Sequence, residues 1–198
     1  TGGEQLWKSS FLHQGEIVQP GYHRLFLDKY KMWVEQTATD RVSFYRFTYT
    51  EDNPADILLN LGGYVGTSTM VNAHVNKKGN NSVEGYFDTT GRLWGGPDVV
   101  RIYFAVTFDT PFKALDGWVD QQRLTDINEL QGTKESTPRN RGMSYHDAPT
   151  SGVKANYQVQ AGEQLQMKVA ISYVSTDNAW ENLEQDCNHW NFDQVRQN

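Results

Sequence analysis

Apolar and polar residues alternate along two long stretches of the chain, and this two-residue period predicts β-strands with one buried face. In residues 99–108 the apolar positions are Val100, Ile102, Phe104, Val106 and Phe108. In residues 164–174 they are Leu165, Met167, Val169, Ile171 and Tyr173. Opposite this second set stand Gln164, Gln166, Lys168 and Ser172. We expect the two apolar sets to be buried and the polar set to face solvent.

Shorter alternating runs and frequent turn signals continue the same pattern. The runs place Ile57, Leu59 and Leu61 on one face of a strand, and Val71, Ala73 and Val75 on one face of another. The turn signals between runs are Asp52-Asn53-Pro54, Gly62-Gly63, Lys78-Gly79-Asn80-Asn81, Thr90-Gly91 and Gly95-Gly96-Pro97. Short strands separated in this way predict an all-β fold in which antiparallel sheets pack as a sandwich. A doubly wound α/β fold is disfavoured because no helical pattern occurs before residue 175.

A helical pattern occurs at the carboxyl end of the chain. Ala179, Leu183 and Cys187 recur at four-residue spacing after Ser175 and Thr176, which are good helix caps. We therefore expect a helix over residues 176–187. The chain then divides into a β-sandwich domain, residues 1–175, and a helical linker, residues 176–198, that leads toward a catalytic domain absent from this chain.

A linker between two domains has to bury its apolar residues on two sides. We expect Ala179 and Leu183 to pack on the sandwich, and Trp180, Trp190 and Phe192 to face the second domain in part. In that case the substitution Phe192→Ala should cost the sandwich little stability. Before the last strands, residues 131–152 are polar and contain two prolines and three glycines. This composition predicts a long loop, either functional or mobile.

Composition excludes several classes of function. The net charge of −6 leaves no basic surface for nucleic acid, and no apolar run approaches the roughly 20 residues of a membrane span. The single cysteine, Cys187, excludes an internal disulfide and a cysteine-rich zinc site. No histidine pair has the spacing of a zinc motif, and neither a serine-hydrolase elbow nor a phosphate-binding loop is present.

Four stretches carry a family signature, in the same order as in that family. They are residues 11–16 (FLHQGE) with Pro20-Gly21-Tyr22, residues 35–42 (EQTATDRV) with Arg46-Phe47, residues 102–112 (IYFAVTFDTPF), and residues 169–183 (VAISYVSTDNAWENL) with Asn191-Phe192-Asp193. They resemble the N-terminal domain of glycoside hydrolase family 92, the calcium-dependent, exo-acting α-mannosidases. Leu12, His23 and Tyr45 depart from the family pattern.

The resemblance implies a galactose-mutarotase-like supersandwich that packs against a C-terminal helical-barrel domain of the same protein. It implies inverting hydrolysis of terminal α-mannosides in a mannose-containing glycan, with the acid, the base and the calcium ion held by the second domain. We therefore expect no catalytic residue, metal site or cofactor in this chain. A secreted or periplasmic location is also implied.

Three residues are candidates for contact with the sugar. His13 and Glu16 come from the family motif, although they could equally hold the entry to the first strand. Trp94 lies in a glycine-rich turn and could stack on a sugar ring or fold back over the sandwich edge. Trp33 and Trp118 are more typical of a core. The acids Asp126, Glu129, Glu181 and Glu184 are spaced like surface residues, and His146-Asp147 fits a polar loop better than a metal site.

Two other functions remain open at this level. The chain could be a free-standing carbohydrate-binding or protein-interaction sandwich with its own ligand. A complete small enzyme on a mutarotase-like scaffold is the third reading.

Overall fold

Strands make up most of the described part of the chain, which comprises residues 7–62, 64–65, 68–90, 99–133 and 151–197 of this computed structural model. Those of the first half are β1 (Ile17–Gln19), β2 (Tyr22–Leu27), β3 (Met32–Ala38), β4 (Val42–Tyr49), β5 (Asn53–Asn60), β6 (Tyr64–Val65), β7 (Ser68–Lys78) and β8 (Ser82–Thr90). Those of the second half are β9 (Val99–Phe108), β10 (Ala114–Val119), β11 (Gln122–Leu124), β12 (Glu129–Thr133), β13 (Ser151–Val159) and β14 (Gln164–Ser172). Two helices follow, α2 (Thr176–Cys187) and α3 (Phe192–Gln197).

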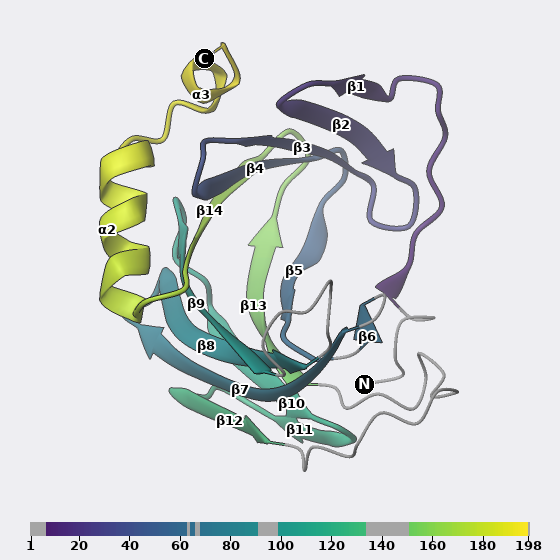
Figure 1. Cartoon of the computed structure of the whole chain (residues 1–198). Helices are drawn as coiled ribbons and strands as arrows, with labels where there is room; N and C mark the ends of the chain where they lie inside the picture. The colour runs from purple at the N-terminus through teal and green to yellow at the C-terminus, as the bar shows by residue number, and fades with distance from the viewer. Residues whose placement is uncertain (1–6, 63, 66–67, 91–98, 134–150, 198) are drawn as a thin grey trace.

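The strands form two antiparallel sheets of unequal size (Figure 1). Within the described residues the larger sheet has ten strands, in the order β1-β2-β3-β4-β14-β9-β8-β7-β12 with β6 beside β7. The smaller sheet has the order β11-β10-β13-β5. The all-β antiparallel sandwich predicted from the sequence is confirmed, and β9 occupies the predicted residues 99–108.

The main core lies between the inner faces of the two sheets. Phe104, Val106 and Phe108 of β9 are buried there, together with Val153 and Val159 of β13. Burial of a side chain of this kind contributes about 1.5–3 kcal/mol, so the alternation in β9 is the main driving force for closing the sandwich at this point.

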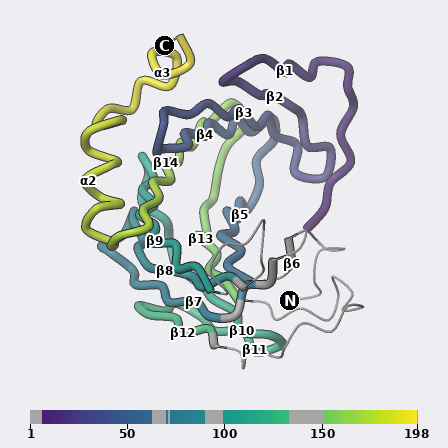
Figure 2. Tube along the Cα trace, in the orientation of Figure 1, coloured from purple at the N-terminus to yellow at the C-terminus, as the bar shows by residue number. Residues whose placement is uncertain are grey.

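The helices cover the outer face of the larger sheet, on the side away from β5 and β13 (Figure 2). Helix α2 begins where the Ser175 hydroxyl accepts a hydrogen bond from the Asn178 N–H, and it ends at Cys187, as predicted. Its buried residues include Ala179 and Leu183, and Leu183 belongs to a second core with Val42 of β4. The predicted packing of these two residues on the sandwich is confirmed.

The helical cover changes the burial that alternation predicts for β14. Lys168 is only 2% exposed and Ser172 is also buried, although we expected both to face solvent. The prediction was wrong because α2 and the segment after it lie over this face. The Lys168 amine keeps its hydrogen bonds by donating to the carbonyls of Cys187 at 2.8 Å and His189 at 3.4 Å. Burial lowers the pKa of Lys168.

Near the carboxyl end of β14, two residues predicted to be buried are exposed. Ile171 is 40% exposed and lines an open cleft between the sheets, and Tyr173 lies past the end of the strand. Alternation assigns a side chain to a face of the sheet, but it cannot tell how far the opposite layer extends over that face.

Phe192 also departs from the prediction, because it is 2% exposed. Its ring meets those of Phe44 and Tyr22 edge-on, with centroids 5.2 Å and 6.4 Å away. Helix α3 thus lays Phe192 on the outer face of the larger sheet, and it does not face another domain. Trp180 and Trp190 are half-buried.

Two segments predicted as turn or loop belong to strands. Asn53 and Pro54 pair with β13, and residues 131–133 and 151–152 lie in β12 and β13. Strands β5 and β12 are both sheet edges in the described part of the chain, where polar residues and a proline without an N–H are tolerated. Residues 134–150 of the predicted loop lie outside the described residues.

Candidate functional site

Two of the three residues predicted to bind sugar lie together at one edge of the larger sheet. His13 Nδ1 is 2.5 Å from Glu16 Oε2, and His23 Nε2 is 3.1 Å from Glu16 Oε1. Each carboxylate oxygen of Glu16 therefore accepts a hydrogen bond from one imidazole. The structure brings His13 and Glu16 together and adds His23, which the sequence did not single out.

The three side chains differ in how far they reach into solvent. The Glu16 side chain is 15% exposed, whereas the His13 side chain is 87% exposed. When Nδ1 of His13 donates to Glu16, the other ring nitrogen, Nε2, is left as an acceptor. The Glu16 carboxylate thus fixes the tautomer of an imidazole that projects from the surface.

The charge of this cluster is centred on Glu16. Hydrogen bonds from His13, then from His23, hold the pKa of Glu16 below its usual value of 4.5. Glu16 is consequently ionised at neutral pH, which is the form that accepts from both rings.

A tight hairpin and two glycines position the cluster. Strands β1 and β2 pair so that Val18 lies opposite His23, and Gly21 in the connecting turn has a φ of +74°, which suits glycine. Gly15 has a φ of +87°, and a Cβ there would lie 3.0 Å from the Trp33 ring. A side chain at position 15 would therefore displace the turn that carries His13 and Glu16.

The remaining candidate residues lie outside the described part of the chain, in the core, or on the surface. Trp94 lies outside the described residues, as do His146 and Asp147. Trp118 is buried, as expected of a core residue, and Trp33 is half-buried. The acids Asp126, Glu129, Glu181 and Glu184 are all exposed, which confirms the prediction that they are surface residues.

A second polar cluster, which sequence reasoning missed, lies where α3 meets the larger sheet. Glu35 Oε1 accepts from the Tyr22 hydroxyl at 2.7 Å and from Arg46 Nη2 at 2.9 Å, and Glu35 Oε2 accepts from Arg46 Nε at 2.8 Å. Arg46 also donates to Asp193 of α3 at 3.1 Å and lies 4.4 Å from the centroid of the Phe192 ring. Both Glu35 and Arg46 fall in the second family stretch, but only the strand register shows that they meet.

Glu35 and Arg46 form an ion pair that is largely shielded from solvent. Burial raises the pKa of Glu35, but hydrogen bonds from Arg46 and Tyr22 bring it below the usual range. The same hydrogen bonds to Glu35 raise the pKa of Arg46. With both oxygens of Glu35 engaged, the cluster fastens α3 to the sheet.

The described residues offer an exposed imidazole held by a carboxylate, and no group of three or more His, Cys, Asp or Glu side chains among them is arranged to hold a metal ion. An imidazole fixed in this way can accept a hydrogen bond from a hydroxyl group or, when protonated, donate one. Neither described helix has the length and apolar run needed to cross a membrane.

The chain resembles known proteins both in its match to a family model and in its fold. A family model described as the glycosyl hydrolase family 92 N-terminal domain matches residues 2–172. No curated protein sequence matches the chain significantly.

Solved structures of similar fold come from the same family of hydrolases. The family GH92 α-mannosidase BT3965 from Bacteroides thetaiotaomicron matches 96% of this chain with a TM-score of 0.76 and 23% identity. The family GH92 inverting mannosidase BT2199 from the same organism matches 96% with a TM-score of 0.71 and 18% identity. The GH92 family glycosyl hydrolase ccman5 matches 98% with a TM-score of 0.77 and 16% identity. At these identities the likeness shows the fold. The chain spans only 24%, 22% and 25% of their respective lengths.

Proposed function

The chain belongs to the glycosyl hydrolase family 92 N-terminal domain family, and from this premise we propose that it is the non-catalytic N-terminal domain of an exo-acting, inverting α-mannosidase. A C-terminal helical-barrel domain of the same protein would supply the acid, the base and the calcium ion. The N-terminal domain would pack against the helical-barrel domain and help to shape the site for a mannose-containing glycan. The observation that carries the proposal is the family match over residues 2–172.

Four of the described carboxylates are poorly suited to act as the proton donor of such a reaction. Inverting hydrolysis needs a carboxylic acid that stays protonated near neutral pH, and so needs a raised pKa. Instead, a hydrogen bond from Arg101 lowers the pKa of Asp88, and one from Arg41 lowers the pKa of Asp186. The pKa values of Glu16 and Glu35 are lowered as well. These four carboxylates are thus held in the ionised form, which suits fastening and binding better than proton donation.

His13 and Glu16 are the residues that we propose for contact with the sugar. In this proposal His13 Nε2 accepts from a hydroxyl group of the glycan at the junction of the two domains, and Glu16 keeps the imidazole in position. The support is the exposure of His13 and its hydrogen bond to Glu16. Trp94 is retained as a proposed sugar platform on the strength of its sequence context alone.

Residues 176–198 would form the linker into the helical-barrel domain. Their two helices follow the last strand and lie on the outer face of the larger sheet, from which a following domain could be reached. A calcium requirement and a secreted or periplasmic location of the full-length protein belong to the same proposal.

The test is a hydrolysis assay on an aryl α-mannoside with the chain 1–198 and with the full-length protein. We expect the full-length protein to release the aryl alcohol and to lose this activity in a calcium chelator. The chain alone should release none, with or without added calcium, because proton transfer and charge stabilisation each supply orders of magnitude in rate. Turnover that copurifies with the chain and disappears on replacing one of its carboxylates contradicts the proposal.

A further inference from the structure

Strand β5 is an edge of the smaller sheet, with β13 on one side and no strand of the described residues on the other. The Leu61 N–H donates to the Ser151 carbonyl at 2.8 Å, directly after the last residue pair of the two strands. Hydrogen-bonding direction alternates along an antiparallel strand, so odd-numbered residues of β5 bond to β13. The N–H and carbonyl groups of Asp56, Leu58 and Asn60 therefore point to the open edge.

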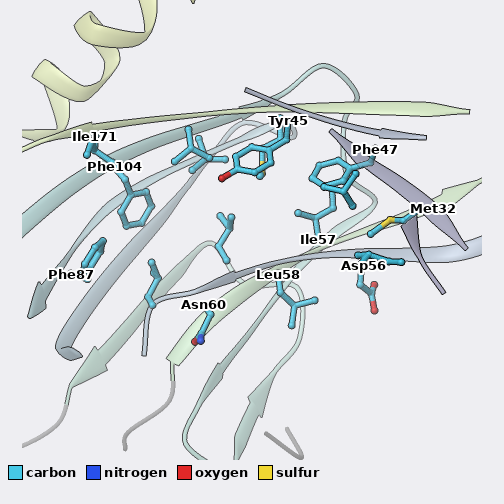
Figure 3. Close-up of a pocket in the computed structure, with 17 residues that line it drawn as sticks. Met32, Tyr45, Phe47, Asp56, Ile57, Leu58, Asn60, Phe87, Phe104 and Ile171 are labelled. Atoms are coloured by element: carbon cyan, nitrogen blue, oxygen red, sulfur yellow. The ribbon is translucent and has the colours of Figure 1, made fainter. Parts of the chain in front are cut away.

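An apolar cleft follows this open edge. It has a volume of about 480 Å³ and lies between β5 and the inner face of the larger sheet (Figure 3). Tyr45, Phe47 and Ile171 line it from the larger sheet, and Ile57 and Leu58 line it from β5. Leu58 is 37% exposed, so the edge of the cleft reaches solvent at this residue.

A second hollow, of about 550 Å³, meets the same edge from the other side. It shares Asp56, Leu58 and Asn60 with the cleft, but its wall includes the charged side chains of Lys29 and Lys154. The open edge of β5 thus runs between an apolar cleft on the inside of the sandwich and a second hollow, in which Lys29 and Lys154 stand beside apolar residues such as Trp7.

Together, the open edge and the two hollows are the features expected of a position where a further β-strand pairs with β5. A strand added to a sheet lies about 4.8 Å from its neighbour, and its side chains alternate between the two faces. Here one set of side chains would enter the apolar cleft and the other set would meet the second hollow, which contains Lys29 and Lys154. Met32, the first residue of β3, borders both hollows, so the two hollows adjoin beside the open edge.

We propose that the open edge of β5 is a strand-addition site, filled by an extended segment of the full-length polypeptide with apolar residues at alternate positions. The inference rests on the proposed function, since it takes the chain as one domain of a longer enzyme. The solved relatives carry about three quarters of their length outside the matching region, so they have ample chain for such a strand. A tether gives the segment a high effective concentration, which a short strand needs in order to bind.

Amide hydrogen exchange resolved to single residues, measured on the full-length protein and on the chain 1–198, tests this proposal. In the chain alone the amides of Asp56, Leu58 and Asn60 should exchange quickly. In the full-length protein a paired strand should slow them by at least about a hundredfold. The amides of Ala55, Ile57 and Leu59 bond to β13 and serve as the internal control, protected in both proteins.

Three outcomes overturn the proposal. Quick exchange of the edge amides in the full-length protein means that no strand is added. Slow exchange in the chain alone at every concentration means that this chain covers its own edge. Slow exchange that appears only as the chain dimerises means that a second copy is the occupant. None of these results depends on mannosidase activity, so this inference and the proposed function can fail separately.

A single substitution provides a second test. Leu58→Pro removes an N–H from the open edge and leaves the hydrogen bonds to β13 in place. It should abolish the extra protection of Asp56 and Asn60 in the full-length protein while leaving Ala55 and Ile57 protected. Unchanged protection of Asp56 and Asn60 in this variant overturns the proposal, and if the variant does not fold, the exchange pattern of the unaltered proteins decides.

Discussion

Glu16 and Glu35 are two carboxylates near the same edge of the larger sheet, and each accepts hydrogen bonds from two side chains. Glu35 binds Arg46 and Tyr22, is buried, and lies under helix α3. Glu16 binds His13 and His23, and the His13 ring projects into solvent. The hydrogen-bonding pattern is similar in the two clusters, but one holds structure together and the other holds a side chain ready for contact.

The difference follows from what lies over each cluster. Arg46 is covered by Phe192 and bonded to Asp193, so the charge of Glu35 is neutralised inside the protein. Removing one member of such a pair leaves the other without its partner, at a cost in stability. Nothing of this kind follows from removing His13, because its ring is already in water. The comparison therefore predicts large stability effects around Glu35 and functional effects around Glu16.

The largest expected effect is that of Phe192→Ala, which removes the cover of the buried cluster. The ring is fully buried against Phe44 and Tyr22, so the free energy of unfolding of the chain should fall by about 3–5 kcal/mol. Leu183→Ala, in the same outer core, should cost about 2–5 kcal/mol and is the matched comparison. Both are measured by urea denaturation. A loss for Phe192→Ala near zero would show that α3 does not pack on the sandwich in solution.

The next effect is that of Glu35→Gln. The amide keeps the shape of the side chain but leaves Arg46 with Asp193 as its only anionic partner, so we expect a loss of about 2–3 kcal/mol in the free energy of unfolding. Glu16→Gln is the control, and it should lower the denaturation midpoint much less, because the hydrogen bond of Glu16 to His13 lies at the surface. Equal effects of the two substitutions would remove the distinction drawn between the clusters.

A smaller effect is expected from pH. The pKa of Glu35 is lowered in the folded chain, so its ionised form stabilises the fold above the unfolded value of about 4.5. This stabilisation should be lost as pH falls below that value toward the lower, folded pKa. The pKa values of Glu16, Asp88, Asp116 and Asp186 are lowered as well, so the informative quantity is the difference between the unaltered chain and Glu35→Gln. That difference should shrink between pH 5 and pH 3, roughly the window of carboxylate titration, and a constant difference would contradict it.

How much could be predicted from the sequence depended on whether a residue's surroundings were local. The bounds of β9 and α2 followed from alternation and from Ser175 as a cap, because both signals lie within the element itself. The burial of Lys168 and Phe192 did not follow, because it depends on how segments far apart in the chain pack together, which propensity does not encode. Lys168 lies under the end of α2, and Phe192 packs on the strands that carry Tyr22 and Phe44. Pro54 was read as a turn because proline interrupts a central strand, whereas β5 is an edge.

The candidate site was predictable in part. The family motif supplied His13 and Glu16, and their spacing of three residues in one turn brought them together. His23 was missed, although the Pro20-Gly21 turn held the signal, since a tight hairpin there places position 23 opposite Val18 and close to Glu16. The cluster of Glu35, Arg46 and Asp193 needs three separate elements, so only the structure could assemble it.

The most direct test of the distinction is the kcat/KM of the full-length protein for an α-mannoside when Glu16 is replaced by Gln. A hydrogen bond to a charged group typically changes an equilibrium constant by roughly ten- to a hundredfold. We predict a fall of at least about tenfold with little change in the denaturation midpoint, and a similar fall for His13→Ala, because the two residues act as one unit. Unaltered kinetics in Glu16→Gln, or a kinetic loss that merely follows a loss of stability, would contradict the account.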